Sequence, residues 1–549
     1  MKIAIAQQNY HIGNFDHNCE QMLAAIETAR QAQADLIVFS ELSVCGYPPR
    51  DFLEFKDFIA RCQGVIDRLR QAAVGIAVVV GAPTVNPKPE GKDLYNSAYF
   101  LADGEVLHVQ HKTLLPTYDI FDEYRYFEPN TIFETVEYKG VRFALTVCED
   151  IWNVGNENPL YTISPMDELI KQQPDVMLNL SASPFTYSHA DERIAVLRAN
   201  VARYGVPCFY VNYTGSSTEI IFDGGSLVMN DAGKVVDELP YFEETIAYYE
   251  LDDLRHSQGR VAEDKVQEKD KMDLIYRALV VGIKDYFAKL GFKKAILGLS
   301  GGIDSAIVAV LAADALGSEQ VRLVLMPSQF SSDHSVSDAL ALANKLGCPH
   351  DIIPIKDIFE SYTATLAPQF ANTVFNITEE NIQARIRGNI LMALSNKFGY
   401  ILLNTSNKSE AAVGYGTLYG DMCGGLSVIG DVYKTEVFAL ARYINRHEEI
   451  IPNNIIIKPP SAELRPNQKD SDSLPEYDEL DELLFQYIEN RQGPKELVAM
   501  GFPKALVDRV LKLVNTNEYK RYQTPPMLRV SSKAFGMGRR MPIEGKYLS

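Results

Sequence analysis

A turn of small residues between an apolar run and a helix-forming run is the clearest chemical signal in the sequence. Residues 295–310 read AILGLSGGIDSAIVAV, so Ser300, Gly301, Gly302 and Ser305 leave the backbone open at the turn. Backbone N–H groups there, with the start of a helix, can bind phosphate. Asp304 is an oxygen ligand where Mg²⁺ on such phosphates would lie. The motif therefore predicts a phosphate site, although it is neither a Walker loop nor a GxGxxG motif.

A second candidate site lies in the first half of the chain. Glu41, Lys112 and Cys148 each follow a run that predicts a strand, and α/β sheets place their chemistry at the carboxyl ends of strands. Glu41 could act as the base that a thiol nucleophile needs, and Lys112 could stabilise an oxyanion. Each residue also has a structural explanation. A cysteine that ends a strand is usually a small buried apolar group, and a glutamate or lysine in a loop is usually solvated.

The composition limits the class of protein. At 549 residues the chain is too long for one core, so we expect two or three domains. A net charge of −19 argues against nucleic acid or an anionic membrane as a partner. We expect no membrane span and no signal peptide, since no apolar run is long enough. The seven cysteines are scattered without zinc spacing, which favours a reduced, cytoplasmic protein.

The first half alternates predicted strands and helices, which indicates an α/β sandwich. The predicted strands are 34–39, 76–80, 142–147, 175–180 and 208–212, and the predicted helices are 18–32, 58–72 and 190–204. Residues 220–226 read as a strand–turn–strand that closes the domain. We expect this domain to span residues 1–252, with a polar, charged linker at 253–271.

The second half, residues 272–549, alternates in the same way and predicts a doubly wound parallel sheet. After a first helix from residue 272, the expected order is strand 295–298, helix 305–316, strand 321–326, helix 333–346, strand 351–355, helix 378–396 and strand 400–404. The small-residue turn joins the first strand to its helix, where such sheets bind nucleotides. Residues 462–477 are rich in Pro, Asp and Ser and predict a mobile surface loop that could act as a lid.

Residues 1–250 resemble the nitrilase amidase family through the strings FSEL with GYPP, HKTLLPTY and VCEDIW. The resemblance implies an α/β/β/α sandwich in which Glu41 is the base, Lys112 the oxyanion stabiliser and Cys148 the nucleophile. Glu123 looks like the second carboxylate of that family. In members that use glutamine, the resemblance implies that Tyr118, Ser183 and His189 contact it, with His189 standing where a lysine is common.

Residues from about 272 onward resemble NAD synthetases through LGLSGGIDS, NIQARIRGN, TSNKSE, YGDMCGG and EYKR. The loop is similar to the pyrophosphatase loop of enzymes that adenylate a substrate, and the fold implied is that of the adenine nucleotide α-hydrolases. The resemblance implies an ATP site formed by Gly298, Leu299, Ser300, Gly301, Gly302, Ile303, Asp304, Ser305, Thr405 and Lys434. It implies contacts to deamido-NAD from Asn381, Arg385, Glu410, Asp421 and Lys520. Asp304 and Glu410 would hold Mg²⁺.

The two resemblances together imply a glutamine-dependent NAD synthetase that amidates deamido-NAD. ATP, glutamine and deamido-NAD are the implied substrates, Mg²⁺ accompanies ATP, and no tightly bound organic cofactor is expected. Ammonia would need a protected path between the sites, and a homo-oligomer is expected. Three alternatives remain open: another amide ligase of the same ATP-pyrophosphatase class, a stand-alone amidase with a regulatory ATP-binding domain, and a non-catalytic ATP-sensing or scaffold protein.

Overall fold

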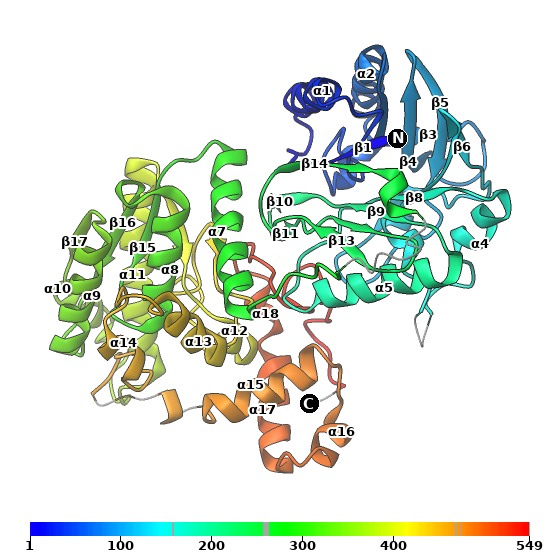
Figure 1. The fold of residues 1–549 in the computed structure, drawn as a ribbon. Coiled ribbons are helices and arrows are strands. Elements are labelled where there is room, and N and C mark those ends of the chain that lie inside the picture. Colours follow the sequence, from blue (N-terminus) through cyan, green and yellow to red (C-terminus); the bar gives the residue numbers. More distant parts are fainter. Residues whose placement is uncertain (156–158, 256–262, 467, 469, 473, 548–549) are drawn as a thin grey trace. The chain divides into compact units, whose positions relative to one another are not determined.

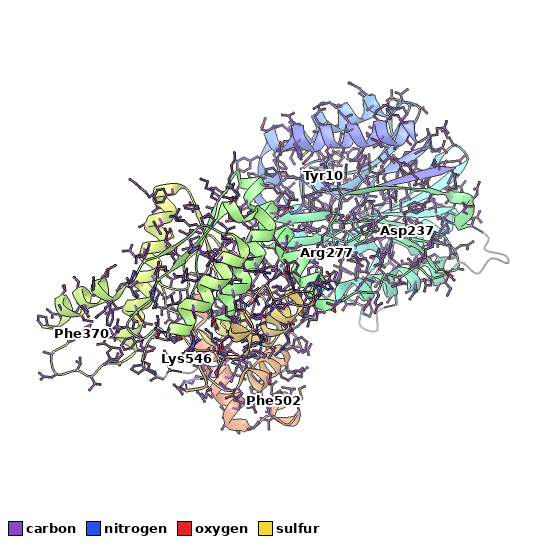
Figure 2. The ribbon with its side chains drawn as sticks, turned by 60° about the vertical axis from the view of Figure 1, so that its left-hand side comes forward. Tyr10, Asp237, Arg277, Phe370, Phe502 and Lys546 are labelled. Carbon is purple, nitrogen blue, oxygen red and sulfur yellow. The ribbon has the colours of Figure 1, made fainter. Side chains whose placement is uncertain are left out.

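The computed structural model describes residues 1–155, 159–255, 263–466, 468, 470–472 and 474–547 (Figure 1). They form two compact units, Met1–Lys269 and Asp270–Ser549. Figure 2 draws the side chains that fill both units. Within the described residues, no helix is both long and apolar enough to cross a membrane.

Two six-stranded mixed sheets form the centre of the first unit. One has the order β14(Thr245–Glu250), β1(Lys2–Gln7), β2(Leu36–Val38), β3(Ala77–Val85), β4(Leu94–Ala102), β5(Glu105–His111). The other has the order β13(Val235–Glu238), β12(Leu227–Met229), β9(Cys208–Val211), β8(Val176–Leu180), β7(Val141–Val147), β6(Val136–Tyr138). A separate hairpin pairs β10(Thr214–Ser217) with β11(Ile220–Asp223). The innermost strands β1, β2 and β3 run parallel, as do β7, β8 and β9.

Alternating side chains divide this unit into four layers. Ile3 and Ile5 point into a core between the two sheets, while Ala4 and Ala6 point into the core beneath helices α1(Phe15–Gln31) and α2(Lys56–Ala72). Successive strand residues face opposite sides, so one strand serves two cores. A third core lies between the second sheet and helices α4(Pro165–Leu169) and α5(His189–Tyr204). The predicted α/β/β/α sandwich is confirmed.

The second unit contains a five-stranded sheet whose strand pairs are all parallel. Its order is β17(His350–Ile352), β16(Val321–Leu325), β15(Ala295–Gly298), β18(Ile401–Asn404), β19(Leu426–Ser427). The strand order reverses between β15 and β18, and ligands bind at such switch points. The predicted doubly wound parallel sheet is confirmed. The predicted strand 351–355 is shorter and shifted, because Pro354 has no N–H group with which to extend the ladder.

Helices cover this sheet, and the second unit also contains a separate cluster of helices. The helices beside the sheet are α7(Lys271–Leu290), α8(Ile303–Leu316), α9(Asp333–Leu346), α10(Lys356–Leu366), α11(Ile377–Phe398), α13(Lys434–Ile444) and α14(Asn453–Ile457). The cluster contains α12(Lys408–Val413), α15(Tyr477–Ile488), α16(Pro494–Ala499) and α17(Lys504–Thr516), which share a hydrophobic core of their own, and α18(Glu518–Arg521) follows α17. The sequence analysis made no prediction for this cluster.

Most of the segment predicted to be a linker contacts the first unit where it is described, and its last two residues, Asp270 and Lys271, begin the second unit. Residues 256–262 lie outside the described residues, and Leu251–Leu254 form the short helix α6. Beyond the gap, Lys265 N donates to the Val235 carbonyl oxygen at 3.0 Å. Lys269 Nζ lies 3.1 Å from Glu238 Oε1. These contacts keep residues 265–269 on the second sheet of the first unit.

Two candidate active sites

A buried ion cluster lies at the first candidate site. Lys112 Nζ lies 2.7 Å from Glu41 Oε1 and 2.8 Å from Glu123 Oε1. Lys112 and Glu41 are fully buried, and Glu123 is 5% exposed. Asn96 Nδ2 and the Ala182 backbone N–H donate to the two oxygens of Glu41, at 2.7 and 3.1 Å. The structure therefore brings together three residues that are distant in the sequence. Glu41 and Glu123, the pair farthest apart, are separated by 82 positions.

Charge and burial oppose one another in this cluster. Burial acts against the charge of Lys112, but Glu123 and Glu41 outweigh it and hold the pKa of the lysine well above its usual value. Burial raises the pKa of Glu123 to about 7, although Lys112 acts in the opposite direction. Lys112 is therefore cationic at neutral pH. An oxyanion that forms beside it would be stabilised in surroundings from which water is excluded.

Cys148 lies at the end of β7, where the chain turns sharply. It has φ of 42° and begins a short 3₁₀ turn, Cys148–Ile151. The carboxylate of Asp150 accepts from the backbone N–H groups of Val147, Thr113 and Leu114 at 2.9–3.0 Å. Since Thr113 follows Lys112 directly, these bonds fix the cysteine turn against the segment that carries the lysine.

The Cys148 thiol is 6% exposed, and its environment makes it dependent on a base. Burial raises its pKa well above the ordinary value; the charge of Glu41 raises it further, and Lys112 opposes both. A buried thiol of this kind is protonated at neutral pH and needs a neighbouring base to become a nucleophile. The structure thus gathers Cys148, Glu41 and Lys112 into one electrostatic unit.

The residues expected to contact glutamine surround this unit. The Tyr118 hydroxyl donates to Glu149 at 2.9 Å, and Ser183 Oγ lies 3.0 Å from His189 Nε2. His189 stacks on Trp152 with ring centroids 4.8 Å apart, and its Nδ1 lies 3.4 Å from Glu192. The imidazole is therefore held between an aromatic face and a carboxylate.

Glu149, which directly follows Cys148 and was not among the predicted residues, also lies at this site. Its carboxylate is 6% exposed and accepts from the hydroxyls of Tyr118 and Tyr161, at 2.9 and 3.0 Å. Burial raises its pKa. Its position beside Cys148 in VCEDIW is the signal that could have pointed to it.

The second candidate site is a cavity of about 310 Å³ in the second unit. The loop between β15 and α8 forms one wall. The cavity is lined by Gly298, Leu299, Ser300, Gly302, Ile303, Asp304, Ser305, Thr405 and Lys434, which are nine of the ten residues expected at an ATP site. The tenth, Gly301, has φ of 80°, and a Cβ there would meet the Ser335 carbonyl oxygen at 2.2 Å. Only glycine therefore fits between this loop and the start of α9.

Asp304, Glu410 and Lys434 form the charged part of the cavity. Asn407 Nδ2 donates to Asp304 Oδ1 at 2.9 Å, Lys434 pairs with Asp304, and Lys434 Nζ lies 3.7 Å from Glu410 Oε1. Burial, followed by the charge of Asp304, raises the pKa of Glu410 to about 8. The Lys434 backbone N–H donates to Ser409 Oγ at 2.9 Å, which ties together the segments that carry Glu410 and Lys434.

The residues expected to contact the dinucleotide gather around one loop, residues 414–421. Thr417 donates from its hydroxyl to Asn381 Oδ1 at 2.7 Å and from its backbone to Asp421 at 2.6 Å. Arg385 Nε donates to the Leu418 carbonyl oxygen at 3.2 Å, and Lys520 Nζ donates to two carbonyl oxygens of the same loop, at 2.8 and 2.9 Å. Asp421 and Glu410 line the cavity, whereas the other three hold the loop beside it.

Several lining residues have no role in the sequence analysis. They are Ser335, Arg387, Lys458, Glu463 and Asp470. Arg387 Nε donates to the Met326 carbonyl oxygen at 3.1 Å, and burial lowers the pKa of this arginine to about 10. Its place two residues after Arg385 on α11 is the signal that could have pointed to it. Glu463 and Asp470 belong to the segment 462–477 that the sequence indicated as a possible lid, although its composition pointed to neither residue. Lys458 follows α14, and no local pattern indicates it.

Models of known protein families match both units of this chain. The family model for carbon-nitrogen hydrolases matches residues 2–258, and that for NAD synthase matches residues 275–524. The glutamine-dependent NAD(+) synthetase of Synechocystis sp. is 45% identical over 98% of each chain, and that of Acinetobacter baylyi is 44% identical over 99% of this chain and 98% of its own.

Solved structures agree with this assignment. A glutamine-dependent NAD+ synthetase from Acinetobacter baumannii, in complex with ADP, is 39% identical with a TM-score of 0.78 and covers 99% of this chain and 98% of its own. A glutamine-dependent NAD(+) synthetase from Cytophaga hutchinsonii, at 21% identity, shares the fold with a TM-score of 0.84 over 99% of this chain and 97% of its own. On the strength of the full-length relatives, this chain belongs to the glutamine-dependent NAD(+) synthetases.

Proposed function

We propose that this protein converts deamido-NAD to NAD, with ATP as the activating substrate and glutamine as the nitrogen donor. AMP, pyrophosphate and glutamate are the other products. The observation that carries the proposal is the presence, in one chain, of a buried Cys148–Glu41–Lys112 cluster and a cavity lined by a phosphate-binding loop. Each supplies the chemistry that the other lacks.

The first unit releases ammonia from glutamine. Glu41 takes the proton of the Cys148 thiol, and the thiolate attacks the side-chain amide carbon. Lys112 stabilises the oxyanion, and ammonia leaves with a proton returned by Glu41. Water activated by Glu41 then hydrolyses the thioester to glutamate and restores the thiol. The closed ion cluster supports this sequence, because it holds base and cation in fixed positions before substrate arrives.

The second unit activates the acceptor. The nicotinate carboxylate of deamido-NAD attacks the α-phosphorus of ATP, and pyrophosphate leaves. Ammonia then attacks the acyl carbon of the adenylate, and AMP leaves as the amide forms. The backbone N–H groups of Ser300 and Gly302 donate to the hydroxyls of Ser305 and Ser300 at 3.2 and 3.1 Å, and phosphate oxygens would replace these acceptors. The side chain of Lys434 on the cavity wall also suits a triphosphate.

Asp304 and Glu410 would hold Mg²⁺ in this cavity. Both are carboxylates on its wall, and Mg²⁺ prefers such oxygen ligands together with substrate phosphates. The raised pKa of Glu410, caused by burial and by Asp304, fits a carboxyl group that a nearby cation would return to its charged form. Among the described residues, no group of three or more His, Cys, Asp or Glu side chains forms a ready metal site. Phosphate oxygens and water would therefore complete the ligand set. Mg²⁺ supplies charge neutralisation on the phosphates.

The test separates the two nitrogen donors. Cys148→Ala is expected to lower glutamine-driven NAD formation by more than about 10³-fold, because the nucleophile is removed. Ammonium-driven NAD formation is expected to stay at the wild-type rate. Cys19→Ala, which removes another fully buried thiol of the same unit, is the matched control and retains both activities. Equal loss with both donors in Cys148→Ala would overturn the proposal.

A further inference from the structure

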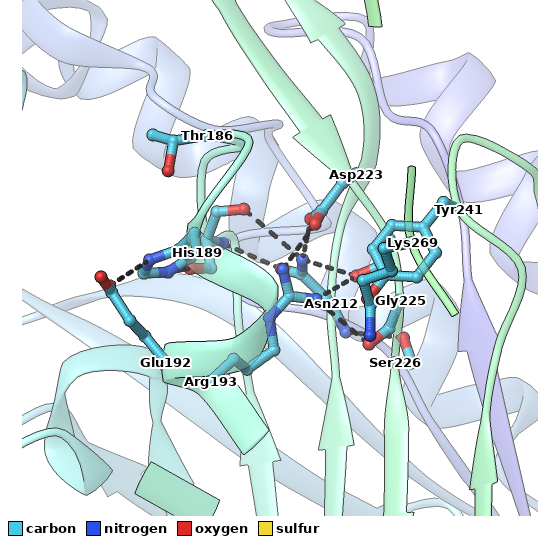
Figure 3. Close-up of polar contacts among 12 residues, drawn as sticks. Thr186, His189, Glu192, Arg193, Asn212, Asp223, Gly225, Ser226, Tyr241 and Lys269 are labelled. Carbon is cyan, nitrogen blue, oxygen red and sulfur yellow. Dashed lines mark hydrogen bonds and ion pairs between the residues drawn. The ribbon is translucent and has the colours of Figure 1, made fainter. Parts of the chain in front are cut away.

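A buried polar network joins Arg193, Asp223 and Asn212 in the first unit (Figure 3). Its centre is Arg193 on α5, which is 1% exposed. Arg193 Nη2 donates to Asp223 Oδ2 at 2.6 Å, and Nη1 donates to the carbonyl oxygens of Gly224 and Gly225 at 2.8 and 3.1 Å. A buried ion pair remains in place only when further hydrogen bonds satisfy it, and these carbonyl groups do so.

The network ends on Asn212, the residue that follows β9. Asn212 Nδ2 lies 3.2 Å from Asp223 Oδ1 and donates to the Gly224 carbonyl oxygen at 2.9 Å. Both the oxygen and the nitrogen of the same amide also contact the backbone of Ser183. Ser183 N donates to Asn212 Oδ1 at 2.9 Å, and Nδ2 reaches the Ser183 carbonyl oxygen at 3.4 Å. One side chain therefore holds both backbone polar groups of this serine.

The segment that Asn212 holds, Ala182 and Ser183, lies beside the residues of the first candidate site. Ser183 Oγ lies 3.0 Å from His189 Nε2. The preceding residue, Ala182, donates its backbone N–H to Glu41 Oε2 at 3.1 Å. His189 and Arg193 are four positions apart on α5, so they lie on the same face of this helix. The helix thus presents one residue to the site and the other to the network that supports it.

We infer that Asn212 is a positioning residue for glutamine recognition, held in place by the Arg193–Asp223 ion pair. It acts through Ser183, whose hydroxyl it aims at the bound glutamine. The inference rests on the proposed function for the role of Ser183. If Asn212 had only a structural role, its loss would change glutamine recognition only together with stability. If Asn212 positions Ser183, its loss raises the KM for glutamine.

The first experiment is Asn212→Ala in the full chain. The Ser183 backbone N–H loses its acceptor inside the protein, so kcat/KM for glutamine is expected to fall by about 10- to 100-fold, mainly through KM. Ammonium-driven NAD formation, which bypasses this site, is expected to stay unchanged. An unchanged KM for glutamine would overturn the inference.

A double variant tests whether Asn212 acts through Ser183. Ser183→Ala alone raises the KM for glutamine. If Asn212 works by aiming that hydroxyl, the Ser183→Ala/Asn212→Ala variant has a KM within about twofold of the worse single variant. Multiplied single effects would show that Asn212 acts independently of Ser183, and the inference would fail.

Two further variants keep the test decisive if Asn212→Ala does not fold. Asp223→Asn preserves shape but removes the charge opposite Arg193 and leaves one acceptor oxygen for two donors, Arg193 and Asn212, so a smaller rise in KM for glutamine is expected together with a lower melting temperature. No rise would count against the inference. Asn230→Ala is the matched control, since Asn230 is 2% exposed in the same unit and its amide oxygen holds only the turn residues Ala232 and Lys234. It is expected to leave the KM for glutamine unchanged.

Alkylation of Cys148 separates failure of this inference from failure of the proposed function. A thiol-reactive diazoketone analogue of glutamine is compared with iodoacetamide, which lacks the amino acid groups, and the Cys148 peptide is measured by mass spectrometry. In Asn212→Ala, labelling by the analogue is expected to slow while labelling by iodoacetamide does not. Equal slowing overturns the positioning role. Absence of NAD formation by the wild-type chain with either donor overturns the proposed function alone.

Discussion

The two sites balance their charges in different ways. At the first site the charges pair with one another: Lys112 lies between Glu41 and Glu123, and all three are nearly inaccessible. At the second site the carboxylates, which also outnumber the cations, line a cavity. The carboxylates are Asp304, Glu410, Asp421, Glu463 and Asp470, and the cations are Arg387, Lys434 and Lys458.

This difference follows from what each site binds. A glutaminase needs its base and its cation in place before a neutral amide arrives, so the protein supplies both signs of charge. An ATP site receives several negative charges from its substrate, and an excess of carboxylates is compatible with that only when a metal cation arrives too. Under the proposed function, the first site therefore holds its charges in place without ligand, whereas the second would be completed by its ligands.

Among the variants that test this comparison, loss of Asp304 is expected to have the largest effect on activity. Asp304→Asn removes a charge that would hold Mg²⁺ under the proposed function, so NAD formation is expected to fall by about 10²- to 10³-fold with both glutamine and ammonium. Hydrolysis of glutamine to glutamate is expected to persist. AMP and glutamate assays measure the two halves separately. Retention of ammonium-driven synthesis in this variant would break the comparison.

Removal of Lys112, the cation at the centre of the first site, tests whether the charges of this site stabilise one another. Lys112→Met leaves Glu41 and Glu123 buried without the cation that pairs with both, which is expected to destabilise the first unit by about 3–5 kcal/mol and to abolish glutamine use. Lys171→Met is the matched control: its side chain is 65% exposed beside Glu168, and its loss is expected to cost less than about 1 kcal/mol. Thermal unfolding followed by circular dichroism measures both, and equal melting temperatures would contradict the assignment.

A methyl group in the phosphate loop should affect the second site alone. Gly301→Ala places a Cβ against the Ser335 carbonyl oxygen, so the loop must shift, and the KM for ATP is expected to rise by about tenfold. Gly317→Ala is the matched control, because Gly317 also has positive φ, 87°, but its Cβ would meet nothing within 4 Å. If both variants raise the KM for ATP equally, backbone strain rather than the close approach is responsible.

The smallest expected effect is a change in how stability varies with pH. Burial raises the pKa of Glu123 to about 7 in the folded chain, above the value of about 4.3 for an unperturbed glutamate. Between these values the folded state binds more protons than the unfolded state, so the contribution of Glu123 to stability declines as pH rises from about 4.5 to 7.

The matched comparison is Glu123→Gln, which cannot ionise. Its melting temperature is expected to fall less than that of the wild-type chain between pH 5 and pH 8. Part of the decline remains, because burial also raises the pKa of Asp150 to about 6. Parallel melting curves for the two chains would show that Glu123 does not titrate in this range.

The sequence by itself determined the features that depend on neighbours along the chain. Alternation of strands with helices predicted both sheet architectures, since apolar strands with helices between them are buried on both faces. The run from Gly298 to Ser305 predicted the phosphate loop, because small residues, a strand end and a helix start are all local. The ends of predicted strands likewise indicated Glu41, Lys112 and Cys148.

Only the tertiary structure decided which distant groups meet and what each one does there. Lys112 pairs with Glu41 across 71 positions, and Lys434 pairs with Asp304 across 130. The amide of Asn212 clamps Ser183 from 29 positions away, which no local pattern signals. Asn381, Arg385 and Lys520 fix a loop beside the cavity instead of lining it. Local propensity carries no information about such contacts, because their partners are set by how the sheets and helices pack.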